Sequence, residues 1–226
     1  DLRKKIGFLG LMGGDEFNKN CIEMDEWIIN ELDQKNPLIS ILPTASTNYK
    51  PELAISNAMN YFNALGARVT NAPIYSREDS NNSNVVDQLR NADLIYIIGG
   101  DPFYLSNVIK ESYCEYVLKD LLGLGKSIVG SSAGAMFLGT TFLQDISRCT
   151  VIPHFENRSD LQKLVKDSDD TTILGIDSAT GIFTTNSGWK VLGEKFVHLI
   201  SSGIVKSFSK NQYIKNLAII SDIDKI

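Results

Sequence analysis

The sequence predicts an α/β protein with a doubly wound, mostly parallel sheet layered between helices. Apolar runs of strand length alternate with helical patterns along most of the chain, which is typical of parallel strands joined by crossover helices. Two of these runs end in small residues, at 93–100 (DLIYIIGG) and at 127–134 (SIVGSSAG). Ligands of such sheets bind beyond the carboxyl ends of the strands, so these two turns are the expected place of a site.

The first part of the chain carries strand-like runs with helical patterns between them. Strands are expected at 4–10, 37–43, 67–74 and 93–100, and helices at 24–35, 51–66 and 83–92. Pro51 suits the first turn of a helix and Gly66 its end, which sets the bounds of the helix between them. The polar segment 76–84 is expected to be a surface loop.

The second part begins with a long helix, expected near 104–122, and a strand-turn-helix unit at 127–139. After residue 145 the pattern changes to short β-like pieces and one helix, at 149–155, 171–177, 181–188 and 190–203 respectively. The segment from 204 onward has no clear pattern. Because no repeat or linker divides the sequence, residues 1–226 are expected to form a single domain.

Composition limits the classes of function. The net charge of −5, without any basic run, argues against nucleic acid or an anionic membrane as a partner. Hydrophobic residues make up 43% of the chain, enough for a full core, and the longest apolar runs have strand length, so no membrane span is expected. No secretory signal precedes the first strand, which predicts a cytoplasmic protein. The sequence gives no oligomeric state.

The three cysteines are odd in number and far apart. Cys21, Cys114 and Cys149 therefore do not form the pattern of a disulfide framework or of a Cys-x-x-Cys metal site. Neither a metal nor an organic cofactor is expected. The glycines at 7, 10, 13 and 14 do not have the Gly-x-Gly-x-x-Gly spacing, and no acidic residue closes a second strand, so a nucleotide cofactor is not expected either.

The most informative pattern is Gly-x-Ser-x-Gly, formed by Gly130, Ser132 and Gly134 between a strand and a helix. It matches a nucleophile elbow, in which a sharp turn exposes a serine hydroxyl beside the free N–H groups of a helix start. Such a turn needs small neighbours because both flanks approach adjacent backbone. The alternative is a small-residue turn that packs a helix on a sheet and has no chemistry.

A serine nucleophile needs a base, and the chain contains two histidines. His154 follows the β-like run CTVI and Pro153, 22 residues after Ser132, so it is well placed to face the serine. His198 falls in the expected helix 190–203, where a packing or surface role is the better interpretation. His154 is therefore the expected base.

A third group is expected to orient the imidazole. Asp177 leads because it closes the strand-like run TTILGID and can reach the same edge of the sheet. Asp145 and Glu156 are alternatives, although Glu156 lies only two residues from His154 and needs a reversed turn. Each of the three can equally be a solvated loop carboxylate.

The run IIGGDPFYL at 97–105 offers a second donor for an oxyanion. Two glycines after a buried strand let backbone N–H groups approach a ligand, so Gly100 or Asp101 is expected to act beside the N–H of Ala133. The alternative is a plain strand-to-helix turn.

Taken in order, IIGGDPFYL, GSSAGAM, Pro-His-Phe and ILGID resemble the peptidase E and cyanophycinase family of serine peptidases, over roughly residues 37 to 190. The resemblance implies a three-layer α/β/α fold like that of class I glutamine amidotransferases. It implies Ser132 as nucleophile, His154 as base, and Gly100 and Ala133 in the oxyanion hole. Substrates of the family are peptide bonds next to acidic residues, including dipeptides with an N-terminal aspartate.

Two departures from the family pattern bear on activity. Ser178 stands where relatives carry a glutamate, so the acid of the triad is Asp177, another residue, or absent. Arg158 is the only arginine between His154 and Asp177 and is the expected contact for a substrate carboxylate, and Asp101 is a second residue expected to bind the substrate. The sequence thus predicts a serine peptidase, or another amide or ester hydrolase, acting on short peptides. The alternative is a relative that has lost catalysis and binds a small ligand or partner.

Overall fold

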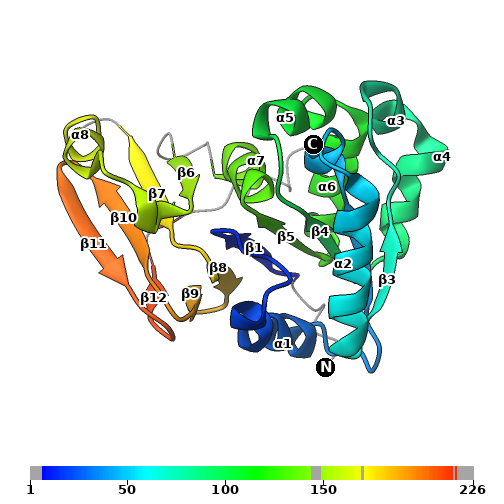
Figure 1. Ribbon diagram of the computed structural model, residues 1–226, viewed down its shortest axis with the longest axis horizontal. Coiled ribbons are helices and arrows are strands. Elements are labelled where there is room, and N and C mark those ends of the chain that lie inside the picture. Colours follow the sequence, from blue (N-terminus) through cyan, green and yellow to red (C-terminus); the bar gives the residue numbers. More distant parts are fainter. Residues whose placement is uncertain (1–6, 144–148, 169–170, 216, 218–226) are drawn as a thin grey trace.

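A computed structural model describes residues 7–143, 149–168, 171–215 and 217. The strands of this part of the chain form an eight-stranded sheet and a four-stranded sheet (Figure 1). The main sheet has the order β12-β9-β8-β1-β5-β4-β2-β3, and the second sheet has the order β11-β10-β7-β6.

The main sheet has a parallel part and an antiparallel part. The parallel strands are β1 (Leu9–Met12), β2 (Leu38–Leu42), β3 (Arg68–Asn71), β4 (Leu94–Ile97) and β5 (Ser127–Ser131). The antiparallel strands extend the sheet beyond β1 and are β8 (Thr180–Thr185), β9 (Gly188–Gly193) and β12 (Tyr213–Ile214). Because β1, β5 and β4 are neighbours and parallel, the turns that follow them meet at one edge.

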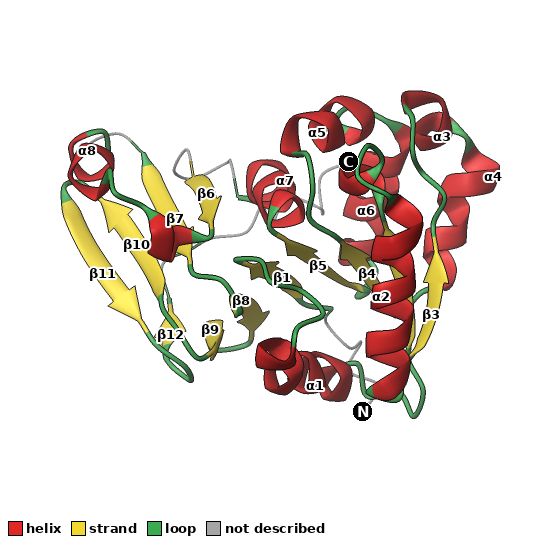
Figure 2. Cartoon of the chain, in the orientation of Figure 1, coloured by secondary structure: helices red, strands yellow, loops and turns green. Residues whose placement is uncertain are grey.

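Helices cover both faces of the main sheet (Figure 2). α1 (Ile22–Glu31) and α2 (Pro51–Ala64) pack on one face, where Phe62 and Tyr96 are fully buried. The other face carries α5 (Pro102–Ile109), α6 (Tyr113–Gly123) and α7 (Ala133–Phe142). Alternate residues of the central strands supply the two cores, as Leu11 and Met12 show. The expected three-layer, mostly parallel α/β/α architecture is confirmed.

The second sheet holds β6 (Cys149–Pro153), β7 (Thr172–Ile176), β10 (Val197–Ser201) and β11 (Ile204–Phe208), with α8 (Leu161–Lys166) packed against β10. It lies on the left in Figure 1, on the side of the main sheet that carries β8, β9 and β12. β6 and β7 are parallel, so the residues after them also meet at one edge.

Three backbone hydrogen bonds hold the turn after β1, one to the start of β8 in the main sheet and two to residues that follow β6 and β7. The N–H of Gly13 donates to the carbonyl of Thr180 (2.9 Å), and the N–H of Ala179 donates to the carbonyl of Gly14 (3.0 Å). The N–H of His154 donates to the carbonyl of Gly13 (2.9 Å). The turn after β1 is thus fixed between the residues that follow β6 and β7.

The expected helix at 190–203 is wrong, because this segment forms the end of β9 and all of β10. Gly193 has φ of +101°, which ends β9, and β10 then pairs with β7 and β11. The apolar residues that suggested one helix face are core contacts of two strands. Residues 204–208, which had no clear pattern, form β11.

Three further expectations about helices need correction. Residues 77–81 form α3 (Arg77–Asn81) instead of a loop, because Ser76 and Asp79 make a capping box. The helix expected at 104–122 is divided into α5 and α6, since Glu111 has φ of 58° and Ser112 caps α6. The helix expected at 83–92 is α4 (Ser83–Val86) followed by a 3₁₀ turn, η3 (Asp87–Asn91).

The bounds of the other elements differ by a few residues. β1 begins at Leu9, later than the expected 4–10, of which residues 4–6 lie outside the described residues. Short 3₁₀ turns occur at η1 (Lys19–Cys21), η2 (Thr44–Ser46) and η4 (Phe155–Asn157). Within the described residues, no helix is both long and apolar enough to cross a lipid bilayer.

Candidate active site

Ser132 lies in the sharp turn between β5 and α7. Its backbone has φ of 51° and ψ of −111°, a conformation that is strained for any residue with a side chain. The N–H of Ser132 donates to the carbonyl of Met12 (3.0 Å), so the turn is anchored to the end of β1. The surrounding sheet therefore holds the serine in a conformation that an isolated turn would not keep.

Small residues on both sides of Ser132 allow this turn to form. A Cβ on Gly134 would lie 2.3 Å from the carbonyl oxygen of Ile97, and a Cβ on Gly130 would lie 2.4 Å from the carbonyl carbon of Gly134. Any larger residue at either position would displace backbone. The expectation that the residues on both sides of Ser132 must be small, because they approach adjacent backbone, therefore agrees with the structure.

His154 faces Ser132 across the junction of the two sheets. Its Nε2 lies 3.2 Å from the Ser132 Oγ. Gly14, with φ of +118°, lies directly against the imidazole, and a Cβ there would come within 2.1 Å of the ring carbon Cε1. Gly14, one of the glycines that did not fit a nucleotide site, instead provides space for the histidine ring.

The other imidazole nitrogen of His154 contacts Ser178. Its Nδ1 lies 2.9 Å from the Ser178 Oγ. When Nδ1 carries the proton and donates it to Ser178, Nε2 is free to accept the hydrogen bond from Ser132. Ser178 thus occupies the position in which the sequence predicted a carboxylate.

Behind Ser178 lies Glu156. One carboxylate oxygen, Oε2, accepts the Ser178 N–H (2.9 Å), and the other, Oε1, accepts from Lys195 Nζ (2.8 Å). Burial raises the pKa of Glu156, but hydrogen bonds from Lys195 and from the backbone and hydroxyl of Ser178 outweigh it and lower the pKa to about 2. Glu156 therefore carries a negative charge at neutral pH, and Ser178 lies between its carboxylate and the His154 ring.

Asp177 has other partners. Its Oδ1 lies 3.4 Å from His198 Nε2, and its Oδ2 accepts the N–H of Phe196 (3.1 Å). The expectation that Asp177 orients His154 is thus corrected: Asp177 directly follows β7 and its carboxylate faces β10, whereas the chain turns at Ser178, whose hydroxyl reaches His154. His198 lies in β10, not in a helix, and its ring packs on Phe155 at 5.0 Å.

The two expected oxyanion donors belong to the turns that follow the neighbouring strands β5 and β4. Ala133 begins α7 and Gly100 follows β4, the neighbour of β5 in the sheet. Within the described residues, neither backbone N–H donates to a protein acceptor. Asp101 differs: its N–H donates to the carbonyl of Ala45 (2.8 Å), and its carboxylate caps α5. Both the N–H and the carboxylate of Asp101 thus make hydrogen bonds that stabilise the fold.

Arg158 is paired within its own loop. Its Nε and Nη2 contact the two carboxylate oxygens of Asp160 at 2.8 and 2.5 Å. The Arg158 guanidinium, which was expected to bind a substrate carboxylate, is thus already paired with the carboxylate of Asp160. Asp145, the remaining alternative for the triad acid, lies outside the described residues.

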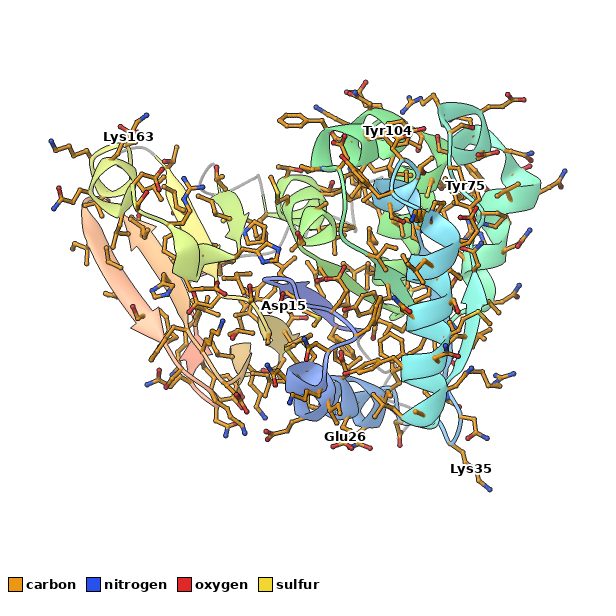
Figure 3. All side chains as sticks on the ribbon, viewed as in Figure 1. Asp15, Glu26, Lys35, Tyr75, Tyr104 and Lys163 are labelled. Carbon is orange, nitrogen blue, oxygen red and sulfur yellow. The ribbon has the colours of Figure 1, made fainter. Side chains whose placement is uncertain are left out.

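Glu16, which is not among the expected site residues, lies close to the nucleophile. Its carboxylate accepts hydrogen bonds from the Gly99 N–H and from the Ser131 Oγ, both at 2.8 Å. The preceding residue, Asp15, is labelled in Figure 3 close to β1. A carboxylate two residues after a Gly-Gly turn is the signal in the sequence that points to this residue.

No cluster of three or more metal-ligating side chains occurs among the residues that the structure describes. The three cysteines are buried free thiols, and burial raises their pKa values to about 12 for Cys21 and Cys114 and to about 11 for Cys149. These thiols are inert at neutral pH. The arrangement of Ser132, His154 and two backbone donors is suited to acyl transfer from a carbonyl substrate.

Comparison with known proteins gives one consistent family. The family model for Peptidase family S51 matches residues 9–192. An uncharacterized peptidase of Pasteurella multocida is 26% identical over 102 residues, which are 45% of this chain and 48% of that protein. A cyanophycinase of Synechococcus elongatus is 26% identical over 189 residues, covering 72% of this chain and 58% of that protein. The chain thus spans about half the length of these curated relatives.

Solved structures share the fold. A peptidase from an acI-B1 Actinobacterium superposes with a TM-score of 0.80 at 26% identity, over 94% of this chain and 98% of that one. A putative peptidase E protein from Listeria monocytogenes superposes with a TM-score of 0.60 at 19% identity, over 83% of this chain and 98% of that one. The second likeness supports the fold alone.

Proposed function

The chain belongs to peptidase family S51, and on that premise we propose that it is a serine peptidase that hydrolyses short peptides. Ser132 is the nucleophile and His154 is the general base. The observation that carries the proposal is the 3.2 Å contact between Ser132 Oγ and His154 Nε2, at a strained turn between a strand and a helix. That turn has the features of a nucleophile elbow.

In the first half of the reaction, Ser132 Oγ attacks the carbonyl carbon of the scissile bond while His154 Nε2 takes the hydroxyl proton. The N–H groups of Gly100 and Ala133 stabilise the negative oxygen of the tetrahedral intermediate. His154 then gives the proton to the leaving amine, and the C–N bond breaks. Water attacks the resulting ester in the second half, with the same histidine as base, and restores Ser132.

Ser178 and Glu156 orient the imidazole in this proposal. Glu156 is ionised and accepts the backbone N–H of Ser178, and the nearby Ser178 hydroxyl also lowers its pKa. In this proposal the hydroxyl points its hydrogen toward the carboxylate and offers its lone pair to the His154 Nδ1–H. The proton is thereby held on Nδ1, and Nε2 is left as the acceptor for Ser132. The charge of Glu156 also stabilises the imidazolium that forms during attack.

Short peptides are the proposed substrates, without a requirement for an acidic residue. The resemblance to peptidase E suggested an acidic N-terminal residue, for which Arg158 was the candidate partner. Its bidentate contact with Asp160 removes support for that role, because a substrate carboxylate would have to displace an existing one.

A fluorophosphonate probe tests the proposal, because it phosphonylates only an activated serine. We expect covalent labelling of the intact protein, seen as a mass increase, loss of labelling in Ser132→Ala, and full labelling in the control Ser187→Ala, which changes an exposed serine between β8 and β9. Failure of the intact protein to react would contradict the proposal.

A second candidate function is binding of a small ligand without turnover. The observation that favours it is Ser178, a neutral hydroxyl where relatives carry a carboxylate, because loss of a triad acid lowers the rate by up to about 10⁴-fold. Absence of fluorophosphonate labelling in a folded protein would support this candidate.

A further inference from the structure

The turn after β1 contacts both members of the proposed catalytic pair. The N–H of Ser132 donates to the carbonyl of Met12, the last residue of β1 (3.0 Å). The N–H of His154 donates to the carbonyl of Gly13, the next residue along the chain (2.9 Å). The same turn carries Glu16, whose carboxylate the catalytic steps above do not use. A side chain in this place can act on the geometry of the site without touching the substrate.

The carboxylate of Glu16 bridges the turns that follow β4 and β5. Its Oε1 accepts the N–H of Gly99 and its Oε2 accepts the hydroxyl of Ser131, both at 2.8 Å. Ser131 is fully buried, and a Cβ built on Gly99 would lie 2.8 Å from Oε1 and 3.2 Å from the Cβ of Ser132. These groups are thus closely packed, and Glu16 joins the residue before the nucleophile to the residue before Gly100.

Hydrogen bonds hold the turn after β4 from two sides. The N–H of Asp101 donates to the carbonyl of Ala45, in the 3₁₀ turn η2 that follows β2 (2.8 Å). The N–H of Gly99 donates to Glu16, which follows β1 on the opposite side of β4. Between these two anchors Gly100 is exposed, and within the described residues its N–H donates to no protein acceptor. The direction of this N–H therefore depends on both anchors.

The backbone on both sides of Glu16 is strained. Asp15 and Phe17 have φ of 61° and 64°, in the left-handed region that residues with a side chain rarely adopt. The ring of Phe17 packs on Phe62 and Tyr96, with centroids 5.8 and 5.7 Å apart, and these contacts hold the strained turn in place. Backbone strain that the surrounding structure maintains is concentrated at functional sites. Here it directs the Glu16 carboxylate toward the turns after β4 and β5.

We propose that Glu16 is a positioning residue that fixes the oxyanion donor Gly100 relative to the nucleophile Ser132. This inference rests on the proposed function and concerns how the site is held. The two groups that Glu16 joins both donate, since the Gly99 N–H can only donate and the Ser131 hydroxyl donates here. A carboxylate accepts at two separate oxygens, and its charge strengthens both hydrogen bonds. The side chain at this position therefore matches both donors.

Fluorophosphonate labelling measures this role. The bond between Ser132 Oγ and phosphorus forms as fluoride leaves and His154 takes the serine proton, and the phosphoryl oxygen of the adduct lies where the oxyanion would form. We expect Glu16→Ala to slow labelling about 10- to 100-fold, because Gly100 is displaced relative to the serine but not removed. The ³¹P resonance of the adduct responds to hydrogen bonds on the phosphoryl oxygen, so it should differ from that of the wild-type adduct.

Glu16→Gln is the conservative variant. Its Oε1 can accept the Gly99 N–H while its Nε2 donates to the Ser131 hydroxyl, which then becomes the acceptor. We expect labelling within about fivefold of the wild-type rate and a wild-type ³¹P resonance, since only the charge assistance is lost. Ser131→Ala removes one of the two contacts and should slow labelling about 3- to 10-fold. The control Glu26→Ala, at an exposed position of α1 seen at the lower edge of Figure 3, should change neither readout.

A role confined to stability predicts a lower urea midpoint for Glu16→Ala, with the wild-type rate and resonance in the folded protein, and that result would overturn the inference. A loss in Glu16→Gln as large as in Glu16→Ala would overturn it too. If Glu16→Ala does not fold, Ser131→Ala decides, and a wild-type rate and resonance there would count against the inference. In each of these cases the wild-type protein reacts and the proposed function stands. Failure of the wild-type protein to react would remove both.

Discussion

The nucleophile and the base come from two parts of the molecule that are held together in different ways. Ser132 follows a central strand of the main sheet, and β1, β4 and β5 are buried along their whole length. His154 follows β6 in the second sheet, where β11 is almost entirely exposed and the local core consists of Phe155, Ile173 and Ile200. The buried strands of the main sheet fix the position of Ser132, while polar contacts fix the position of His154.

This difference predicts how the two parts respond to substitution. Changes around Ser132 should lower both stability and activity, because the turn depends on close backbone packing. Changes around His154 should lower activity with a smaller effect on stability, because Lys195 and Glu156 of its network are partly exposed, although Ser178 is buried.

The largest effect on activity is expected for His154→Ala. Loss of the general base should lower the rate of Ser132 labelling and of peptide hydrolysis by about 10²–10⁴-fold. The midpoint of urea unfolding should change little, since the ring is only half-buried. The control is His198→Ala in the same sheet, which should keep activity within a few-fold. Equal losses in the two histidine variants would refute the assignment of His154.

Gly134→Ala is the matching change on the nucleophile side. The added methyl group would meet the carbonyl oxygen of Ile97 at 2.3 Å, so we expect a loss of about 1–3 kcal/mol in the free energy of unfolding. Displacement of the turn should lower activity by up to about 10²-fold. Gly66→Ala adds a methyl group that would meet nothing within 4 Å, so any loss of stability there reports the strain of alanine at φ of +90° and not a steric clash. An unchanged denaturation curve for Gly134→Ala would show that the turn is less tightly packed than the structure implies.

Glu156→Gln is expected to lower activity about tenfold. Without the charge, the Ser178 hydroxyl is free to donate to His154 Nδ1 and favour the wrong tautomer, and reorienting one neutral hydrogen bond changes the free energy by about 1 kcal/mol. Glu156→Asp, which keeps the charge, should recover part of the rate. Full activity in the glutamine variant would show that Ser178 acts without Glu156.

The same residue gives a pH dependence of stability. The pKa of Glu156 is lowered from 4.5 to about 2 in the folded state, so its contribution is fully present above pH 4.5 and is lost as the pH falls toward 2. Glu156→Gln should therefore show a flatter decline of the urea midpoint over this range than the wild-type protein. Parallel declines would indicate that Glu156 is not ion-paired in solution.

The same contrast explains what the sequence could predict. The main-sheet side follows from local patterns: apolar runs mark its strands, and small residues mark the turn that holds Ser132. The position of His154 follows from its place after a strand. Contacts between sheets have no such local pattern. The helix expected at 190–203 failed because two consecutive strands can carry the same apolar spacing as one helix face, and only pairing with β7 and β8 decides between them.

The partner of His154 was missed for a related reason. Asp177 and Ser178 are adjacent, and a carboxylate was preferred because of its chemistry. The chain turns at Ser178 and Ala179, directly after Asp177, so a difference of one residue decides which side chain reaches His154. Glu156, weighed as an alternative, lies behind Ser178 because the 3₁₀ turn η4 reverses the chain after His154.

Asp177→Asn tests this one-residue difference. Because Asp177 contacts His198 and the Phe196 N–H, its replacement should cost about 1–2 kcal/mol of stability and change kcat/KM by less than about threefold. A thousandfold loss of activity with unchanged stability would restore Asp177 as the orienting acid. Ser178→Ala is the paired variant, and it should lower activity more than Asp177→Asn does.

The smallest effect is expected for Arg158→Ala. Its guanidinium and Asp160 form an exposed ion pair within one loop, and such pairs often contribute nothing measurable to stability. We expect an unchanged unfolding midpoint and less than a twofold change in kcat/KM for dipeptides with either an aspartate or an alanine first. Selective loss of the aspartate substrate would show that Arg158 exchanges Asp160 for a substrate carboxylate. The second sheet would then supply specificity as well as the base, and the polar contacts that hold it would be the part of the site that adapts to the substrate.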